Sequence, residues 1–331
     1  MSSVSVILCT FNGERFLQEQ LDSIANQTRL PDEVVVGDDG STDGTLALLE
    51  TWKDSVPFPV KICQNPQNLG HTKNFEAASR ASSGDVLFFC DQDDVWHADK
   101  IARVMEIFDR QNETGIVFHN TSVVDEAGNP IGLDELQLRG RGNRLCSLRF
   151  FCPVDDSAPI VSGCCCAIRR DLLMEMLPFF CAHDVCIYAL GRARTHIETV
   201  LDPLMDYRYH SKNVSLCESW EKKCARDTEL ERTLYKLDVP RFWGHLAEIE
   251  EYKRRISSFP DSPAKAERLK FLRFLTSHLT NRSRIQRNAL IFAPLFLWEV
   301  ISLHYFRRNQ PFRSMIYDLL CGLKLRKVEQ Q

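Results

Sequence analysis

Three carboxylates stand within four consecutive residues, Asp91-Gln92-Asp93-Asp94, directly after the hydrophobic run from Val86 to Cys90. Carboxylates this close repel one another, and a divalent cation is the usual means by which a protein neutralises such a cluster. Oxygen ligands favour a hard ion, Mg²⁺ or Mn²⁺, which also binds the oxygens of a diphosphate. The cluster therefore predicts a cation site for a phosphorylated ligand, and the alternative is a capped helix that begins near Asp94.

Two more polar segments each follow an apolar run. Thr10-Phe11-Asn12-Gly13 comes after the first run, and Asp38-Asp39-Gly40-Ser41-Thr42-Asp43-Gly44 comes after the second. A carboxylate in such a loop can accept a hydrogen bond from a ribose hydroxyl or a base N–H, and glycine allows the backbone to come close to a ligand. A plain turn with a helix cap at Ser41 or Asp43 would account for the same residues without a ligand.

These loops can meet only if the elements before them lie side by side. The first 110 residues alternate short apolar runs with helical patterns: strands are expected at Val4 to Cys9, Glu33 to Gly37, Val60 to Gln64 and Val86 to Cys90, and helices at Arg15 to Ala25, Thr45 to Trp52, Asn74 to Ala81 and Lys100 to Phe108. Such apolar strands, separated by helices, indicate a parallel sheet buried on both faces. In that architecture ligands bind beyond the carboxyl ends of the strands.

The pattern is less regular after residue 110. We expect strands at Gly115 to Val124, Pro159 to Ile168 and Thr195 to Leu201, a turn at Glu126 to Asn129, a polar loop from Gly132 to Asn143, and a helix from Asp171 to Leu177 capped by Asp171. A helical pattern follows Cys217, which predicts two domains, residues 1–217 and 218–331.

Taken in order, these motifs resemble those of family 2 glycosyltransferases, which have the nucleotide-sugar-binding GT-A fold. The resemblance covers about Val4 to Val214 and is carried by Ser5 to Asn12, Val35 to Asp43, Asn68-Leu69-Gly70 with Asn74, Ser83-Gly84-Asp85, Asp91 to Trp96, His183-Asp184 and Tyr207 to His210. It implies an α/β fold: a Rossmann-like, mostly parallel sheet flanked by helices, with a helical C-terminal region.

The resemblance also implies roles for individual residues at the predicted strand ends. Those expected to bind the nucleotide are Thr10, Asn12, Asp38, Asp39 and Asp91. Those expected to hold Mg²⁺ or Mn²⁺ are Asp93 and Asp91, as an Asp-x-Asp pair, with His210, and Asp94 is expected to assist. Two basic side chains, Lys73 and Arg208, are candidates for phosphate contact.

The resemblance makes Asp184 the general base that deprotonates an acceptor hydroxyl. Attack on the anomeric carbon from the face opposite the departing diphosphate would invert its configuration. A carboxylate can act in this way only within hydrogen-bond reach of the hydroxyl. Read alone, His183-Asp184 is an ordinary helix start, and the Val185-Cys186 that follows departs from the aromatic residues common at this point in the family.

The predicted activity is therefore transfer of a sugar from a nucleotide diphosphate donor to an acceptor, a glycan or glycolipid of the cell surface, with inversion. Similar motifs are common in rhamnosyl and related transferases, which is an argument from analogy. Two alternatives stay open. The chain could be a sugar nucleotidyltransferase, although it lacks a Gly-rich, basic phosphate loop after its first strand, or a non-catalytic nucleotide-sugar-binding assembly protein.

Charge is distributed unevenly along the chain, whose net charge is -4. Residues 264–331 carry 13 Lys and Arg against 4 Asp and Glu, which indicates contact with an anionic partner. A membrane surface fits this tail better than nucleic acid, for which we expect no role, and packing in a homo-oligomer is the other option. The apolar stretch Asn288 to Phe306 contains Pro294 and Glu299, so an interfacial or packing helix is favoured over a membrane span.

The start of the chain and its cysteines indicate the compartment. Met1-Ser2-Ser3 leads directly into a strand-like run without the pattern of a signal peptide, so we expect a cytoplasmic protein, peripheral to the inner membrane face if the tail binds lipid. Thirteen cysteines, irregularly spaced and often inside apolar runs, indicate buried reduced thiols. Adjacent residues of a strand point to opposite faces, so Cys164-Cys165-Cys166 does not predict a zinc site.

Overall fold

The computed structural model describes residues 2–134, 162–211, 213, 242–287, 295 and 298. The chain forms two compact units, one with the described residues up to Asn213 and the other with those from Phe242. The predicted boundary near residue 217 lies outside the described residues. Each unit is considered by itself below.

The first unit is built on one mixed sheet, which has nine strands in the part of the chain that is described. The strands are β1 (Val4–Thr10), β2 (Glu33–Asp38), β3 (Val60–Gln64), β4 (Val86–Cys90), β5 (Val95–Trp96), β6 (Thr114–Val124), β7 (Pro130–Asp134), β8 (Cys166–Arg169) and β9 (His196–Arg208). Their order is β3-β2-β1-β4-β8-β6-β9-β5, with β7 paired to β6. The pairs among β3, β2, β1 and β4 are parallel, as is β6 with β9, whereas β8, β5 and β7 run antiparallel to their neighbours.

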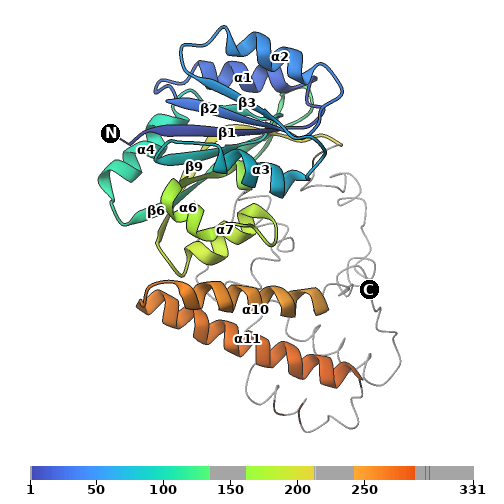
Figure 1. The fold of residues 1–331 in the computed structure, drawn as a ribbon, viewed down its shortest axis with the longest axis vertical. Coiled ribbons are helices and arrows are strands. Elements are labelled where there is room, and N and C mark those ends of the chain that lie inside the picture. The colour runs from blue at the N-terminus through green and yellow to red at the C-terminus, as the bar shows by residue number, and fades with distance from the viewer. Residues whose placement is uncertain are drawn as a thin grey trace. The chain divides into compact units, whose positions relative to one another are not determined.

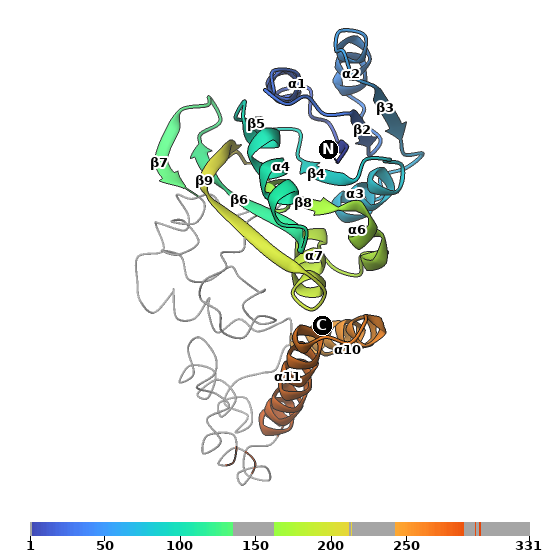
Figure 2. The same cartoon turned by 90° about the vertical axis from the view of Figure 1, so that its left-hand side faces the viewer.

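Helices cover both faces of this sheet, as Figure 1 and the turned view in Figure 2 show. They are α1 (Leu17–Ala25), α2 (Thr45–Lys53), α3 (His71–Arg80), α4 (Lys100–Arg110), α6 (Arg170–Met176) and α7 (His183–Gly191). In Figure 1, α1 and α2 lie on one side of β1 to β3, and α3 lies on the other. The predicted α/β fold, a mostly parallel sheet flanked by helices, is confirmed.

Burial explains why these segments adopt these elements. Every residue of β1 and of β4 is buried, as expected for strands covered on both faces. In α4 the buried residues include Ile101, Val104, Met105 and Phe108, at the spacing that places side chains on one helix face. The continuous apolar runs of β1 and β4 and the periodicity of α4 are why the sequence predicts these three elements to within two residues.

The later elements depart from the sequence pattern. Residues Gly163–Cys165 form a short 3-10 helix, η2, and β8 begins only at Cys166, although the pattern predicts one strand from Pro159 to Ile168. Strand β9 does not end at Leu201, because its pairing with β6 continues as far as Arg208. Strand β5 has only two residues, too few for a recognisable pattern. Strand β7 (Pro130–Asp134) includes the first residues of the predicted polar loop from Gly132 to Asn143, so this loop begins later than predicted. Asp171 lies in the first turn of α6 and is not its cap.

The second unit contains a pair of packed helices, α10 (Phe242–Ser258) and α11 (Pro263–Arg287). Ile249, Tyr252, Ile256 and Leu272 are buried in this unit. Ser262 begins α11, because its hydroxyl and carbonyl oxygens accept the amide hydrogens of Lys265 and Ala266. Among the described residues, no helix is both long and apolar enough to span a bilayer. The apolar stretch Asn288 to Phe306 lies outside the described residues apart from positions 295 and 298.

Gly84 offers a test of how tightly the sheet packs. A Cβ added to this residue would lie 2.7 Å from the backbone nitrogen of Ser5 and 3.0 Å from the carbonyl carbon of Val4. Since backbone atoms cannot move aside cheaply, Gly84→Ala should lower the free energy of unfolding by about 1–3 kcal/mol in urea denaturation. Gly44→Ala is the control, because its Cβ would meet only the flexible end of Glu14. An equal loss of stability in the two variants would contradict this explanation.

Candidate active site

The sheet brings the predicted loops together. Thr10 at the end of β1 pairs with Asp38 at the end of β2, and Leu8 pairs with Cys90 at the end of β4. The segments that follow these three strands therefore leave the same edge of the sheet, as the sequence predicts.

Asp38 organises the loop after β2. Its side chain is fully buried and accepts hydrogen bonds from the hydroxyl of Thr10 at 2.9 Å and from the hydroxyl and amide of Ser41 at 2.5 and 2.9 Å. Thr10 ends β1, and Ser41 lies in the loop after β2. Asp38 thus holds these two segments together inside the protein, and its contact with a nucleotide stays a prediction.

Asp39 holds a third loop in place. Its carboxylate accepts bonds from the side-chain amide of Asn65 at 2.9 Å and from the backbone amides of Leu69 and Gly70 at 2.8 and 2.9 Å. Gly70 has φ of 83°, a conformation that favours glycine. The backbone amides of Leu69 and Gly70 therefore bind the carboxylate of Asp39, and only 3% of Asp39 remains exposed.

Asn12 closes the loop after β1. It has φ of 49°, its side-chain oxygen accepts the amide of Thr42 at 2.8 Å, and its own amide donates to the hydroxyl of Ser41 at 2.9 Å. Asparagine is one of the few residues that adopts such a φ readily. Beside it Phe11 is 46% exposed and presents a ring at this edge, a feature that the sequence analysis did not single out.

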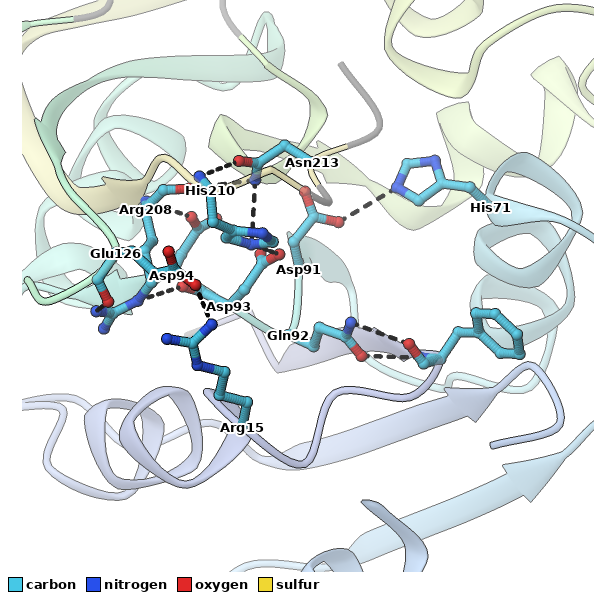
Figure 3. Close-up of polar contacts among 11 residues, drawn as sticks. Arg15, His71, Asp91, Gln92, Asp93, Asp94, Glu126, Arg208, His210 and Asn213 are labelled. Atoms are coloured by element: carbon cyan, nitrogen blue, oxygen red, sulfur yellow. Dashed lines mark hydrogen bonds and ion pairs between the residues drawn. The ribbon is translucent and has the colours of Figure 1, made fainter. Parts of the chain in front are cut away.

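Gln92 joins the acidic turn, residues Asp91 to Asp94, to the loop that follows β1, as Figure 3 shows. Its side-chain oxygen accepts the amide of Phe11 at 2.8 Å, and its side-chain nitrogen donates to the carbonyl of Phe11 at 3.2 Å. A Cβ at Gly13 would come within 2.2 Å of the same side-chain oxygen, which explains the glycine. The middle residue of Asp-x-Asp is therefore structural, and no pattern in the sequence signals its partner.

Asp91 faces a histidine that the sequence analysis missed. His71 is the first residue of α3, and its Nε2 lies 3.3 Å from Oδ1 of Asp91 (Figure 3). Burial would raise the pKa of Asp91, but the hydrogen bond and charge of His71 outweigh it and hold that pKa below its usual value. Burial would likewise lower the pKa of His71, but Asp91, Asp184 and Asp93 together raise it.

Asp93 meets His210 across the turn. Nε2 of His210 lies 2.9 Å from Oδ2 of Asp93, and the two side chains are 7% and 15% exposed respectively. Asn213 accepts the backbone amide of His210 at 2.6 Å, which holds the histidine in this position. The structure therefore brings together two of the three residues predicted to bind a metal, which are 117 residues apart in the chain.

Asp94 completes the acidic cluster from inside. It is fully buried, and burial, reinforced by the charges of Asp93 and Asp91, raises its pKa well above the usual value. Oδ1 accepts the amide of Arg208 at 3.2 Å, whereas Oδ2 has no N–H or O–H donor among the described residues. Ligand atoms of Asp91, Asp94 and Cys164 lie within 4.8 Å of one another. A carboxylate oxygen without such a donor, close to the carboxylate of Asp91, suits a divalent cation. This group differs from the predicted Asp91, Asp93 and His210, of which the structure pairs only Asp93 with His210.

The predicted phosphate contacts, Lys73 and Arg208, both donate to protein acceptors, and a contact with phosphate stays a prediction. Nζ of Lys73 donates to Glu76 at 3.0 Å and to the carbonyl of Phe179 at 3.3 Å. Arg208 is only 2% exposed, and its guanidinium donates to protein acceptors. A basic residue near a site can serve the protein itself, and sequence alone does not distinguish the two uses.

Asp184 lies in the first turn of α7, where its Oδ1 accepts the amide of Val185 at 2.8 Å. The helix dipole favours a carboxylate at this end. His71 is close enough to Asp184 and to Asp91 for both to raise its pKa. The predicted base is therefore on the same side of the molecule as the acidic turn, in a partly exposed position.

His183 anchors α7 beside this base. Its ring packs against Phe75, Phe89 and His71 at centroid distances of 4.5, 5.3 and 5.1 Å, and neither of its nitrogens has a hydrogen-bond partner among the described residues. A Cβ at Gly163 would lie 2.1 Å from Nε2. Burial lowers the pKa of His183 to about 4, so the imidazole is neutral at neutral pH.

A buried lysine lies behind the acidic turn. Nζ of Lys100 donates to the carbonyl of Cys164 at 3.1 Å and lies 3.7 Å from the ring centroid of Trp96. Burial lowers its pKa, while nearby groups that include Asp94 oppose that shift. Of the eight cysteines among the described residues, six are buried, which confirms the prediction of buried thiols for this part of the chain.

A separate hollow of about 630 Å³ lies at the other end of the strands. Its lining includes Ser2, Gly84, Phe108 and Arg169, none of which belongs to the edge described above. Its residues make ordinary structural contacts, such as the bonds from Arg169 to the carbonyls of Thr114 and Phe108. We therefore place the candidate site at the carboxyl edge, where the polar side chains converge.

Known proteins are similar to this chain in sequence and in fold. The profile of the family described as Glycosyl transferase family 2 matches residues 5–177, just over half of the 331-residue chain. An uncharacterised glycosyltransferase of Nostoc sp. is 30% identical over 218 residues, which cover 63% of this chain and 66% of that protein, just under two thirds of its length. The dTDP-rhamnosyl transferase RfbG of Shigella flexneri is 27% identical over 260 residues, 73% of this chain and 85% of that protein.

Solved structures agree on the fold. The complex of S. aureus TarS 1-349 with UDP superposes with a TM-score of 0.56 at 15% identity and covers 98% of this chain and 91% of that one. The mannosyltransferase PcManGT of Pyrobaculum calidifontis, in complex with GDP-Man and Mn²⁺, gives a TM-score of 0.50 at 19% identity, with coverage of 97% and 87%. The chain thus has the fold of GT-A glycosyltransferases.

The environment of His183 predicts how stability depends on pH. The unfolded chain takes up a proton at this side chain near pH 6.5 and the folded chain only near pH 4, so stability falls as pH falls through this window. The free energy of unfolding lost in this way through His183 amounts to up to about 3 kcal/mol. We expect His183→Phe, which keeps a ring without a titrating group, to lose less stability than wild type between pH 6.5 and pH 4 in urea denaturation. Parallel losses in the two proteins would show that His183 is not buried as a neutral ring.

Proposed function

The chain belongs to glycosyl transferase family 2, and on this premise we propose that it transfers a sugar from a nucleotide diphosphate to an acceptor hydroxyl with inversion, in a reaction that depends on a divalent cation. The observation that carries the proposal is the pairing of Asp93 with His210 at 2.9 Å, next to the loops that end β1 and β2. Carboxylates and an imidazole at this edge would hold a divalent cation, and through the cation the diphosphate of a nucleotide, which the carboxylates alone would repel.

The nucleoside lies against the first two loops in this proposal. Thr10, Asn12 and Asp39 face the base and ribose, and Asp38 keeps their loops in position through the hydroxyl of Ser41. Asp91, which is more exposed than its neighbours, lies towards the ribose. The exposed ring of Phe11 offers a surface on which a base can stack.

The diphosphate lies at the acidic turn. Mg²⁺ or Mn²⁺, held by Asp93 and Asp91 with His210, would neutralise the charge that builds on the leaving diphosphate. The chain's own contribution is to hold these ligands in place, with Asp94 behind them. Fixed carboxylates and an imidazole require little reorganisation when the reaction occurs.

Asp184 is the general base in this proposal. Its Oδ1 already accepts the amide of Val185, so Oδ2 is the oxygen that takes the proton of the acceptor hydroxyl. As the hydroxyl oxygen bonds to the anomeric carbon, the bond from that carbon to the diphosphate breaks, and a nucleoside diphosphate leaves from the opposite face. The configuration at the anomeric carbon is thereby inverted.

The relatives suggest a class of substrate. The Shigella relative is named a dTDP-rhamnosyl transferase, and the match covers 85% of it. We therefore propose a deoxyhexose nucleotide as the donor and a surface glycan or glycolipid as the acceptor. A screen of nucleotide sugars by thermal shift with Mn²⁺ would identify the donor directly.

Two aspartate variants separate donor binding from chemistry. Asp184→Asn should bind the donor as wild type does but lose transfer by about 10²–10⁴-fold, because it removes the base. Asp93→Asn should weaken binding of the donor in the presence of Mn²⁺. Donor binding is measured by calorimetry and transfer by release of nucleoside diphosphate, with the donor identified in the screen.

Asp171→Asn is the matched control for the base. Asp171 also lies in the first turn of a short helix and accepts the next amide, that of Leu172, at 2.7 Å, but it lies at the other end of the sheet. Its variant should transfer sugar normally. Transfer at the wild-type rate by Asp184→Asn would remove Asp184 as base, and normal donor binding with no transfer in wild type would favour a non-catalytic binding protein.

We also propose that the basic C-terminal region binds an anionic membrane surface, which would place the enzyme on the cytoplasmic face. The full chain should float with vesicles of phosphatidylglycerol and not with those of phosphatidylcholine, and the binding should weaken in salt. A chain truncated after Arg287 keeps α10 and α11 intact and should bind less. Equal flotation with the two lipids, or of the full and the truncated chain, would contradict membrane binding by residues 288–331. A dimer in sedimentation would favour self-association instead.

A further inference from the structure

Arg208 is held inside the first unit by acceptors from three parts of the chain. Its Nη2 donates to Oε2 of Glu19 in α1 at 2.5 Å, its Nε donates to the carbonyl of Asp93 at 3.1 Å, and its Nη1 donates to the carbonyl of Glu126 at 3.2 Å. The side chain is only 2% exposed. A buried guanidinium is stable only when its donors are satisfied in this way, and its planar fork suits several acceptors at once.

The backbone of Arg208 lies between both halves of the proposed metal site. Its amide donates to Oδ1 of Asp94 at 3.2 Å. Its carbonyl accepts the side-chain amide of Asn213 at 3.1 Å, and the same side chain accepts the amide of His210 at 2.6 Å. Arg208 thereby contacts the acidic turn directly and is linked to His210 through the side chain of Asn213.

Phe16 adds a common surface for the two basic side chains. The guanidinium carbon of Arg208 lies 5.0 Å from the centroid of the Phe16 ring, and the ring of His210 also lies 5.0 Å from it. A cation over an aromatic face is attracted to it. The start of α1, which carries Phe16 and Glu19, therefore supports both Arg208 and His210.

From this geometry we propose that Arg208 is a positioning residue: with Glu19 it fixes the main chain at Asp93 and the end of β9, so that Asp93 and His210 are held side by side at the proposed cation site. This inference rests on the proposed metal-dependent function. A direct contact with phosphate would need free donors, whereas Nε, Nη1 and Nη2 of Arg208 all donate to protein oxygens.

Binding of Mn²⁺ alone tests the proposal without relying on turnover. Mn²⁺ is titrated into the full-length wild type and Arg208→Lys, and the free ion is measured by electron paramagnetic resonance. Lysine keeps the charge but cannot reach three acceptors at once, so Mn²⁺ should bind about 10-fold or more weakly, as is typical when the partner of a metal ligand is removed. A purely structural role would lower the melting temperature and leave the dissociation constant of the folded protein unchanged.

Further variants show whether Arg208 acts together with Glu19. Glu19→Ala should weaken Mn²⁺ binding in the same direction by a smaller factor, and the double variant should bind no more weakly than Arg208→Lys alone. Arg194→Lys is the matched control, since Arg194 pairs with Glu175 through two bonds of 3.0 and 3.2 Å outside the site. It should bind Mn²⁺ as wild type does.

Each outcome decides between the proposals. An unchanged dissociation constant in Arg208→Lys overturns the positioning role while leaving the metal site in place. A wild type that binds no Mn²⁺ overturns the proposed metal site itself and the positioning role with it.

Discussion

Crowded negative charge at the carboxyl end of β4 is the constraint on which the rest of the site depends. Asp94 is fully buried and its pKa is raised, so each further carboxylate beside it adds to an electrostatic cost that water cannot relieve. The chain meets this cost with side chains from elements that are far apart in sequence. Among the described residues, four groups that can carry positive charge contact the acidic turn or lie beside it: His71, Lys100, Arg208 and His210.

These four groups fall into two classes. Lys100 and Arg208 lie on the core side and donate to main-chain oxygens, those of Cys164 and Asp93 among them, so their positions are tied to the fold. His71 and His210 instead touch the carboxylate oxygens themselves. An imidazole can give up its proton or turn aside, so a cation could take over these contacts without leaving a buried ammonium or guanidinium unpaired. Lys100 and Arg208 therefore stabilise the scaffold, and the two imidazoles contact the carboxylates of the proposed cation site.

The sequence predicts the scaffold better than it predicts these partnerships. Continuous apolar runs identify β1 and β4, and a parallel sheet then requires the loops after them to meet, which is why Asp38 and the acidic turn are found at one edge. The partner of a polar residue depends on tertiary packing, which the local sequence does not reveal. The charge of Arg208 and its place in the motif Tyr207 to His210 suggest a phosphate contact, yet in the folded chain its guanidinium is buried and pairs with Glu19. Gln92 has no signature at all, because its partner is the backbone of Phe11.

The position of Asp184 depends on a side chain without charge. His183 precedes it in α7 and is enclosed by aromatic rings, where burial holds its pKa near 4 and keeps it neutral. Because this ring is neutral, it packs against Phe75 and Phe89 without needing a counter-ion in the apolar interior. The aromatic enclosure of His183 therefore fixes the first turn of α7, and with it the position of the base proposed at Asp184.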